Sequence, residues 1–482
     1  MIAIVALFVP LLIVVQGYTP SDDMLRHVGY ATVDKTWHDY VAFRDGIYAE
    51  MDTHPGWHFY LKGFHGLFGM DPDGLILVSI LSLFALLFVP ACLLLKRPEA
   101  FLIAFLLVTM VDSTLLLRTT MGRPFILQML CVLTFLLYWN FYRKACLSWK
   151  SLAPFFVLSV IQTWAHSTWY LLALPIAAFG IHSYIEREYK KTIAATAAIL
   201  AGIIGGAILT GHPIDYLIWN VKLVIWCLEP APDATIVSEL QAMSLSSTLV
   251  LFFIGYLVLR PVILPQGRES LSHPAAIMAL MCWLMGFFVS RFWSDWGIIA
   301  ALSFVTLDVQ QWLKTKTDER GFDRLVITGF FAAVMIVGFT MAPPFKKIWQ
   351  TDRLAKYRKL ELNPTFQEMA AGADGTVYNT DIFAFYHFVY SRPDADWQFA
   401  LGFGPALMRD DLRGVYYDYA ETKLFESLDP WFQALKPNDL ILLSNVDVRN
   451  ADPSKYYRGL EWLKEGDIWV GRLKPTEPNE LK

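Results

Sequence analysis

Apolar segments separated by polar loops fill most of residues 1–342. A transmembrane helix needs roughly 20 apolar residues, and a helix satisfies its own backbone hydrogen bonds within lipid. The segments 151–165 and 168–184 could form one interrupted helix, but together they are too long for a single crossing. The pattern therefore predicts eleven spans, at residues 2–17, 75–95, 100–117, 124–141, 151–165, 168–184, 192–210, 246–264, 273–290, 297–313 and 324–342.

Composition agrees with a membrane protein. The chain has 482 residues, of which 55% are hydrophobic and 17% are charged, whereas soluble proteins average about 25% charged residues. Residues 1–17 lack a basic start and a small-x-small cleavage pattern, so we expect them to be the first span rather than a removed signal peptide. These features predict a polytopic α-helical membrane protein.

The distribution of basic residues predicts the orientation of the spans. An N-terminus in the cytoplasm puts most basic loop residues inside, as the positive-inside rule requires. Loop 17–74 and residues 343–482 are then expected outside the cytoplasm. The basic residues placed inside are Lys96, Arg97, Arg143, Lys144, Lys150, Arg187, Lys190, Lys191, Arg260, Arg268, Lys314, Lys316, Arg320 and Arg324, and those in the short outer loops are Arg118, Arg123, Lys222 and Arg291.

Two outer loops have apolar patterns too short to span a membrane. In loop 17–74, apolar residues recur with helical spacing between Trp37 and Met51, which predicts an interfacial helix with its aromatic face toward lipid headgroups. A solvent-exposed loop helix is the alternative. In loop 211–245, the stretches 216–219 and 223–226 predict an interfacial or re-entrant helix beside a lipid-access path. The residues on the expected face of the first helix are Trp37, Tyr40, Val41, Ile47, Tyr48 and Met51.

The C-terminal residues 343–482 change from long apolar runs to short alternating elements. Strands are expected near residues 376–379, 397–401, 440–443 and 469–473, and a helix is expected over 382–390. Strands that alternate with helices are typical of an α/β domain. The chain therefore divides into a membrane domain, 1–342, and a C-terminal extracytoplasmic α/β domain, 343–482.

Chemistry is expected in the first outer loop, which opens with the adjacent carboxylates Asp22 and Asp23. Ionisable groups at a membrane boundary usually mark a site, and a carboxylate there can act as a general base. The alternative is structural, because Ser-Asp-Asp is also a good helix N-cap. The loop closes with a segment that contains His54 and His58. No zinc-spaced Cys/His cluster, P-loop or nucleophile elbow occurs in the sequence.

The arrangement resembles the GT-C glycosyltransferases, especially the polyprenyl-phosphate-sugar-dependent enzymes. These include the protein O-mannosyltransferases, the lipid A aminoarabinose transferase and the mycobacterial arabinosyltransferases. Their first outer loop carries an Asp-Glu or Asp-Asp pair with an Arg a few positions on, which Asp22, Asp23 and Arg26 match. The segment from His54 to Tyr60 is similar to their pre-span segment, although this chain has one proline there where the family often has two.

The resemblance implies a GT-C fold and transfer of a sugar from a polyprenyl phosphate to an acceptor hydroxyl. Either carboxylate of the pair can be the base, with Asp22 preferred, and the other can bind a divalent cation such as Mg²⁺ or Mn²⁺, orient Arg26 or cap a helix. The acceptor would be a lipid-linked glycan, a lipid or a protein at the periplasmic face of a bacterial inner membrane. Membrane lipids are the other expected partners, and nucleic acid is not one.

The leaving phosphate needs positive charge, and arginine suits it because guanidinium binds phosphate with two hydrogen bonds. Snorkelling to lipid headgroups is the alternative role for outer-face arginines. A glycan polymerase or ligase with a pyrophosphate-linked donor and a lipid or glycan transporter are the competing functions. The candidate phosphate-binding residues are Arg118, Arg123, Arg291, His166 and Lys62, and the candidate loop residues for donor or acceptor are Arg26, His27, His54 and His58.

Overall fold

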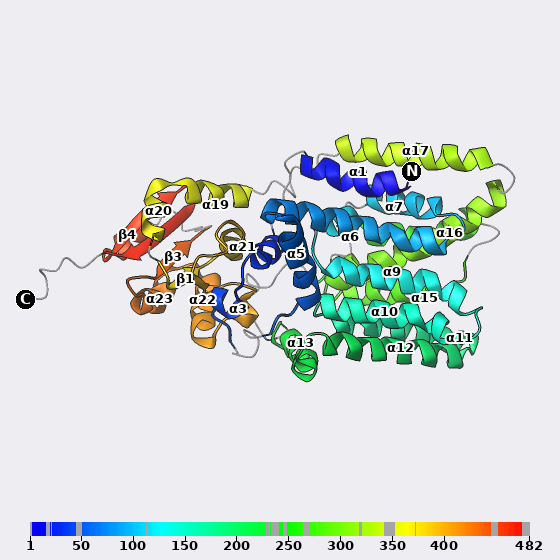
Figure 1. The fold of residues 1–482 in the computed structure, drawn as a ribbon, viewed down its shortest axis with the longest axis horizontal. Coiled ribbons are helices and arrows are strands. Elements are labelled where there is room, and N and C mark those ends of the chain that lie inside the picture. Colours follow the sequence, from blue (N-terminus) through cyan, green and yellow to red (C-terminus); the bar gives the residue numbers. More distant parts are fainter. Residues whose placement is uncertain are drawn as a thin grey trace, which may run out of the picture.

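The computed structural model describes residues 2–474 apart from 16–19, 21, 45–50, 112–113, 228, 230–231, 233–240, 244–247, 264–268, 318–320, 342–351, 372 and 445–451. A helical bundle forms one end of the elongated molecule, and a sheet flanked by helices forms the other end (Figure 1). We call residues 352–474 the C-terminal α/β region.

Among the described residues, each predicted span overlaps helical structure, but the span predicted at 100–117 is divided between two helices. Within the described part of the chain, four helices are long and apolar enough to cross a membrane, or five if a bent pair counts as one span: 72–94, 125–142, 189–208, 292–314 and the pair within 99–120. The bent pair consists of α7 (Glu99–Val111) and α8 (Thr114–Thr120), whose axes differ by 114°. The full count of eleven spans stays a prediction. The bundle helices are α1 (Ile2–Val15), α6 (Pro72–Leu94), α7 (Glu99–Val111), α8 (Thr114–Thr120), α9 (Phe125–Tyr142), α10 (Trp149–Ala165), η1 (Trp169–Leu172), α11 (Ala173–Glu186), α12 (Tyr189–Ile208), α14 (Thr248–Ile263), α15 (Pro274–Gly286), η4 (Phe292–Gly297), α16 (Ile298–Thr317) and α17 (Gly321–Met341).

Small residues let two of these helices approach closely. Gly202 and Gly206 lie one turn apart on α12, and each faces a main-chain carbonyl of α10. A Cβ at Gly202 would lie 2.5 Å from the Phe156 oxygen, and one at Gly206 would lie 2.6 Å from the Val160 oxygen. Within lipid, where hydrophobic burial does not drive association, this close van der Waals contact holds helices together.

The C-terminal α/β region contains a five-stranded sheet in the order β2-β1-β3-β5-β4. Strands β1, β2 and β3 are parallel, whereas β5 runs antiparallel to both β3 and β4. The strands are β1 (Thr376–Asn379), β2 (Gln398–Phe399), β3 (Leu440–Leu443), β4 (Leu460–Glu465) and β5 (Ile468–Leu473), and the helices are α19 (Asp352–Leu362), α20 (Pro364–Ala370), α21 (Ile382–Ser391), η5 (Pro405–Leu407), α22 (Asp410–Thr422), η6 (Phe425–Leu428), α23 (Asp429–Ala434) and α24 (Pro453–Tyr456).

The first outer loop packs against this region. After α2 (Met24–Ala31), helix α3 comprises only Trp37–Tyr40, and Val41 is extended, with φ −139° and ψ 135°. The Ala42 N–H donates to the Phe399 carbonyl at 3.0 Å, so the loop continues beside the sheet.

The predicted interfacial helix from Trp37 to Met51 is therefore wrong, and residues 45–50 of that interval lie outside the described part. Trp37, Tyr40 and Val41 are each 1% exposed. Their apolar surface is buried against protein, because main-chain pairing with the C-terminal α/β region outweighs the helical pattern of the side chains.

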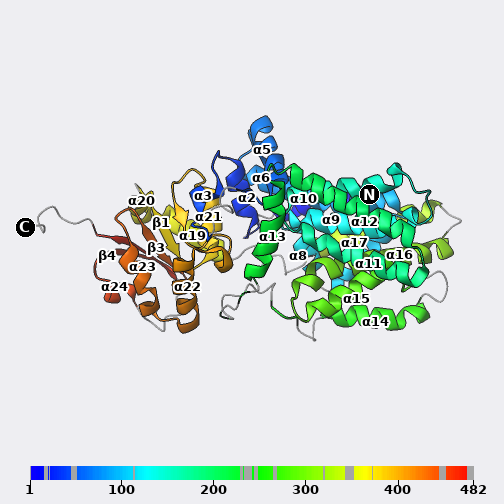
Figure 2. The same cartoon turned by 90° about the horizontal axis from the view of Figure 1, so that it is seen from below.

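Two further helices lie between the bundle and the sheet in both views (Figure 2). Helix α5 (Pro55–Phe68) belongs to the end of the first outer loop, and α13 (Pro213–Cys227) belongs to the second outer loop. On α13, Tyr216 and Trp219 are buried, whereas the opposite face is exposed and apolar. This amphipathic pattern fits the predicted interfacial helix, and its exposed residues are Ile214, Ile218, Val221 and Ile225.

Candidate active site

The acidic pair lies at the start of α2, where the bundle meets the C-terminal α/β region. The Met24 N–H donates to Asp22 Oδ1 at 3.2 Å, whereas Asp23, in the N-cap position, makes no capping hydrogen bond with its side chain. Arg123 bridges the pair, with Nη1 3.6 Å from Asp22 Oδ2 and Nη2 3.3 Å from Asp23 Oδ2. Asp22 therefore contributes a hydrogen bond at the start of α2, whereas the Asp23 side chain has no capping role.

Asp23 is held as a carboxylate. Burial acts to raise its pKa, but the positive charges of Arg26 and Arg123 outweigh burial and hold the pKa well below its usual range. Arg26 donates to Asp23 Oδ1 and is itself 4% exposed. Its guanidinium lies 4.2 Å from the ring centre of Phe403, so a loop of the C-terminal α/β region covers this ion pair.

Two histidines connect Asp23 to a second carboxylate. His27 Nδ1 lies 2.7 Å from His58 Nε2, and His58 Nδ1 lies 2.6 Å from Asp52 Oδ2. At the other end, His27 Nε2 lies 3.5 Å from Asp23 Oδ2. Burial and the charge of Arg26 lower the pKa of His27 to about 3, so this ring is neutral at physiological pH. The result is a chain of hydrogen-bonding groups from Asp52 through His58 to His27, whose Nε2 lies near Asp23 but makes no hydrogen bond to it.

His54 and His166 lie beside this chain without joining it. The His54 ring stands edge-on to His27 and His166, with ring centres 4.8 Å and 4.9 Å apart. Burial lowers the pKa of His54 well below 6.5. His166 forms a 2.6 Å hydrogen bond through Nδ1 to Thr168 Oγ1, which in turn donates to Gln128. These contacts bring the short loop after α10 against the end of the first outer loop.

The candidate arginines gather around Phe125. The guanidinium carbons of Arg118, Arg123 and Arg291 lie 4.5, 5.2 and 6.0 Å from the Phe125 ring centre. Arg118 donates from Nε to Asp295 Oδ1 at 2.6 Å and from Nη2 to Oδ2 at 2.7 Å. Arg291 donates from Nε to the same Oδ2 at 2.9 Å. The structure thus brings all three together, but two of them share a buried carboxylate.

Lys62 is further removed from the arginines. It is half-buried on α5, and its amine lies 5.1 Å from the ring centre of Tyr30. That ring stacks on Trp37 at 4.2 Å and approaches His58 at 4.5 Å. Lys62 therefore lies next to the histidine chain rather than next to the arginines.

Sequence reasoning missed several residues of this site. Asp52 could have been found from its position two and six residues before His54 and His58, which it binds. Asp295 follows Arg291 by one helical turn. Phe403 and Tyr386 come from the C-terminal α/β region, and only folding brings them here. Burial raises the pKa of Tyr386, and the charges of Asp23, Arg26 and Arg123 also act on its hydroxyl.

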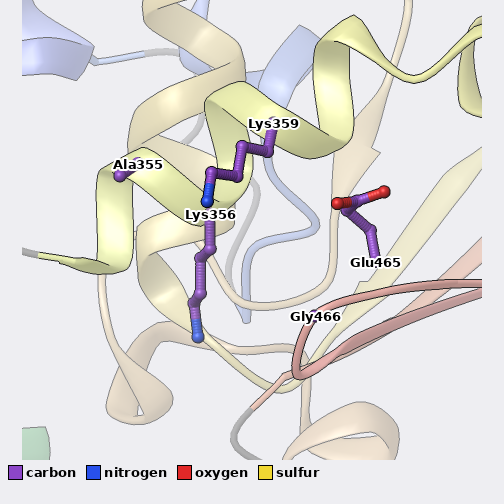
Figure 3. Close-up of a pocket in the computed structure, with 5 residues that line it drawn as sticks. All are labelled: Ala355, Lys356, Lys359, Glu465 and Gly466. Carbon is purple, nitrogen blue, oxygen red and sulfur yellow. The ribbon is translucent and has the colours of Figure 1, made fainter.

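The acidic pair offers few protein ligands for the divalent cation that the sequence predicts there. Among the described residues, no three His, Cys, Asp or Glu side chains are grouped so as to hold a metal ion. Asp23 is enclosed by two guanidinium groups, which compete with a cation for its oxygens. A separate pocket of about 330 Å³ lies between α19 and the β4–β5 hairpin, where Lys356 and Lys359 come from the helix and Glu465 from the hairpin (Figure 3). None of its lining residues is a candidate site residue.

No protein-family model and no curated protein matches the sequence. Two solved oligosaccharyltransferase structures from Archaeoglobus fulgidus are similar to the chain in fold. The archaeal oligosaccharyltransferase AglB, in complex with an inhibitory peptide and a dolichol-phosphate, is 10% identical with a TM-score of 0.52, over 99% of this chain and 74% of that chain. The oligosaccharyltransferase in its apo form is 11% identical with a TM-score of 0.54, over 95% of this chain and 70% of that chain. AglB is a GT-C superfamily membrane glycosyltransferase, so the predicted GT-C fold is confirmed.

Proposed function

We propose that the protein is an integral-membrane glycosyltransferase that moves a sugar from a polyprenyl-phosphate donor to an acceptor hydroxyl at the extracytoplasmic face. The observation that carries the proposal is the bridge from Arg123 to both Asp22 and Asp23, beside the Arg118–Asp295–Arg291 group. Carboxylates that can take a proton and arginines that can hold a phosphate thus belong to one site. The apolar helices around it support an integral membrane location.

Asp22 is the proposed base. The low pKa of Asp23 makes that carboxylate a weak proton acceptor, and its contacts with Arg26 and Arg123 suit it to orient them. In the proposed step, Asp22 takes the proton of the acceptor hydroxyl while the oxygen forms a bond to the anomeric carbon. The bond from that carbon to the phosphate oxygen breaks, and its electron pair leaves with the phosphate.

The leaving phosphate then carries more negative charge than the donor did. The arginines around Phe125 can stabilise this charge through charge-assisted hydrogen bonds in a water-poor setting. The AglB structure was in complex with a dolichol-phosphate, which is a lipid phosphate of the proposed class. A divalent cation at Asp22 or Asp23 stays a prediction, and it predicts that chelation would abolish transfer.

The test is transfer from synthetic polyprenyl-phosphate sugars by the purified protein in lipid nanodiscs. Asp22→Asn should lower turnover by about 10²–10⁴-fold, the usual effect of removing a general base. Asp73→Asn is a suitable control, because Asp73 is a carboxylate at the start of α6 that contacts Tyr390 instead of the acidic pair. Full activity in Asp22→Asn, Asp23→Asn and the double variant would exclude this mechanism. Activity only with pyrophosphate-linked donors would favour a polymerase or ligase, and lipid movement without transfer would favour a transporter.

A further inference from the structure

Asp295 is a buried charge that the proposed reaction does not use. It is 0% exposed and lies in η4, a π-helical turn that leads into α16. Single π-turns are rare and often occur at functional sites. The span that carries it, 292–314, is also the most enclosed of the four long apolar helices, since 83% of its apolar window is buried.

The carboxylate binds two arginines from separate elements. Arg118 comes from α8 and uses its Nε and Nη2 groups, whereas Arg291 is the N-cap residue of η4 and uses Nε. Two guanidinium groups repel each other at such short range unless an anion lies between them. Asp295 thus fixes the mutual position of Arg118 and Arg291 and sets the direction of each planar group.

We infer that Asp295 is a positioning residue for lipid-phosphate binding: it holds Arg118 and Arg291 in the orientation that receives the phosphate of the donor. The inference rests on the proposed function. Asp295 acts through the two arginines and does not itself meet the phosphate, because like charges repel. Its removal should therefore impair the same step as removal of the arginines, and it should cost nothing further once both Arg118 and Arg291 are gone.

The same helix provides a matched control. Asp308 is also 0% exposed, and it binds Arg260 Nη2 at 2.6 Å and the Tyr256 hydroxyl at 2.5 Å. It lies thirteen residues after Asp295, about 20 Å along the helix at the usual rise of roughly 1.5 Å per residue. Loss of either carboxylate removes a buried ion pair, but only Asp295 adjoins the candidate site.

The experiment measures the dissociation constant of a short-chain polyprenyl monophosphate for the protein in nanodiscs, together with kcat and KM for transfer. Asp295→Asn and Arg118→Ala should each weaken binding by about ten- to a hundredfold. Asp295→Asn added to the Arg118→Ala/Arg291→Ala variant should change binding by less than about twofold, because no arginine is left for it to position. Asp308→Asn should lower thermal stability but bind the lipid phosphate within about twofold of wild type.

If Asp295→Asn fails to fold, Asp295→Glu replaces it. That variant keeps the charge but moves the carboxylate by about 1.5 Å, one carbon–carbon bond, and should still weaken binding several-fold. Binding as tight as wild type in a folded Asp295 variant, or a further loss when Asp295→Asn is added to Arg118→Ala/Arg291→Ala, would overturn the inference and leave the proposed function standing. If the wild type neither binds the lipid phosphate nor transfers sugar, the proposed function fails and takes the inference with it.

Discussion

Gly29 of α2 lies directly against the main-chain carbonyl of Val389 on α21, where a Cβ would collide with the carbonyl oxygen. This contact joins the helix that follows the acidic pair to the C-terminal α/β region. Gly29→Ala should separate the two helices, at a cost of about 1–3 kcal/mol for overpacking. Because Phe403 covers Arg26 from the same region, transfer should fall as well. Thermal unfolding and turnover of the purified variant check both effects.

Gly414 provides the control for this substitution. It lies within α22, and a Cβ there would meet no atom within 4 Å. Gly414→Ala should stabilise the protein by up to about 1 kcal/mol, because alanine favours the helix, and should leave transfer unchanged. If the Gly29→Ala protein were as stable and as active as wild type, α2 and α21 could move apart without loss of stability or transfer, and the prediction would be wrong.

Arg123 contacts both carboxylates, so its loss should affect the site more than the fold. Arg123→Ala should lower turnover by about ten- to a hundredfold, the usual effect of losing charge-assisted hydrogen bonds. Arg123→Lys should recover only part of the lost turnover, since an ammonium cannot bridge two carboxylates as a planar guanidinium does. Arg143→Ala, at the opposite end of α9, is the control. Equal turnover of the Ala variant and wild type would make Arg123 a headgroup anchor.

The C-terminal α/β region should lose stability in acid through Glu361. Its carboxylate accepts from His387 Nε2 at 2.9 Å and from Arg392 Nε at 3.1 Å. Although burial acts to raise the pKa of Glu361, these partners lower it to about 2. A carboxyl whose pKa falls on folding stabilises the fold above its unfolded value, and this contribution disappears as the pH drops from about 4.5 to about 2.

Glu361→Gln tests this contribution. At pH 7 the variant should be less stable by on the order of 1–2 kcal/mol, after discounting for solvent screening of a side chain that is 19% exposed. The difference should shrink as both proteins are brought below pH 4. Thermal unfolding over a pH series measures it, and a difference that does not change with pH would contradict the assignment.

Cysteine labelling tests the orientation. In a variant without the five native cysteines, Asp418→Cys should react with an impermeant thiol reagent on intact cells, and Lys190→Cys should react only after lysis. Both side chains are exposed, so accessibility within the protein is not limiting. Labelling of Lys190→Cys from outside and not of Asp418→Cys would reverse the predicted orientation.

The sequence alone determined where the helices form and where much of the chemistry lies. Apolar length specifies a helix in lipid because no water is present to satisfy an open backbone, and the described residues of the predicted segments are mostly helical, although 100–117 is divided between α7 and α8. The strands at residues 376–379 and 440–443 appear as predicted, because short apolar runs bounded by turn residues are typical of buried strands. The sequence also indicated that the acidic pair belongs to a site, because charged side chains next to lipid are energetically costly and usually occur there only at functional sites.

Only the tertiary structure decided how these pieces combine. The segment after Trp37 has helical spacing, yet Val41 is extended because the sheet of the C-terminal α/β region offers main-chain partners more than 350 residues away. Asp295 and Arg118 are likewise 177 residues apart and meet because their helices pack together. The local sequence pattern indicates which residues are buried and whether their spacing is that of a helix or a strand. Pairings such as these join segments that are distant in sequence, so only the folded structure shows them.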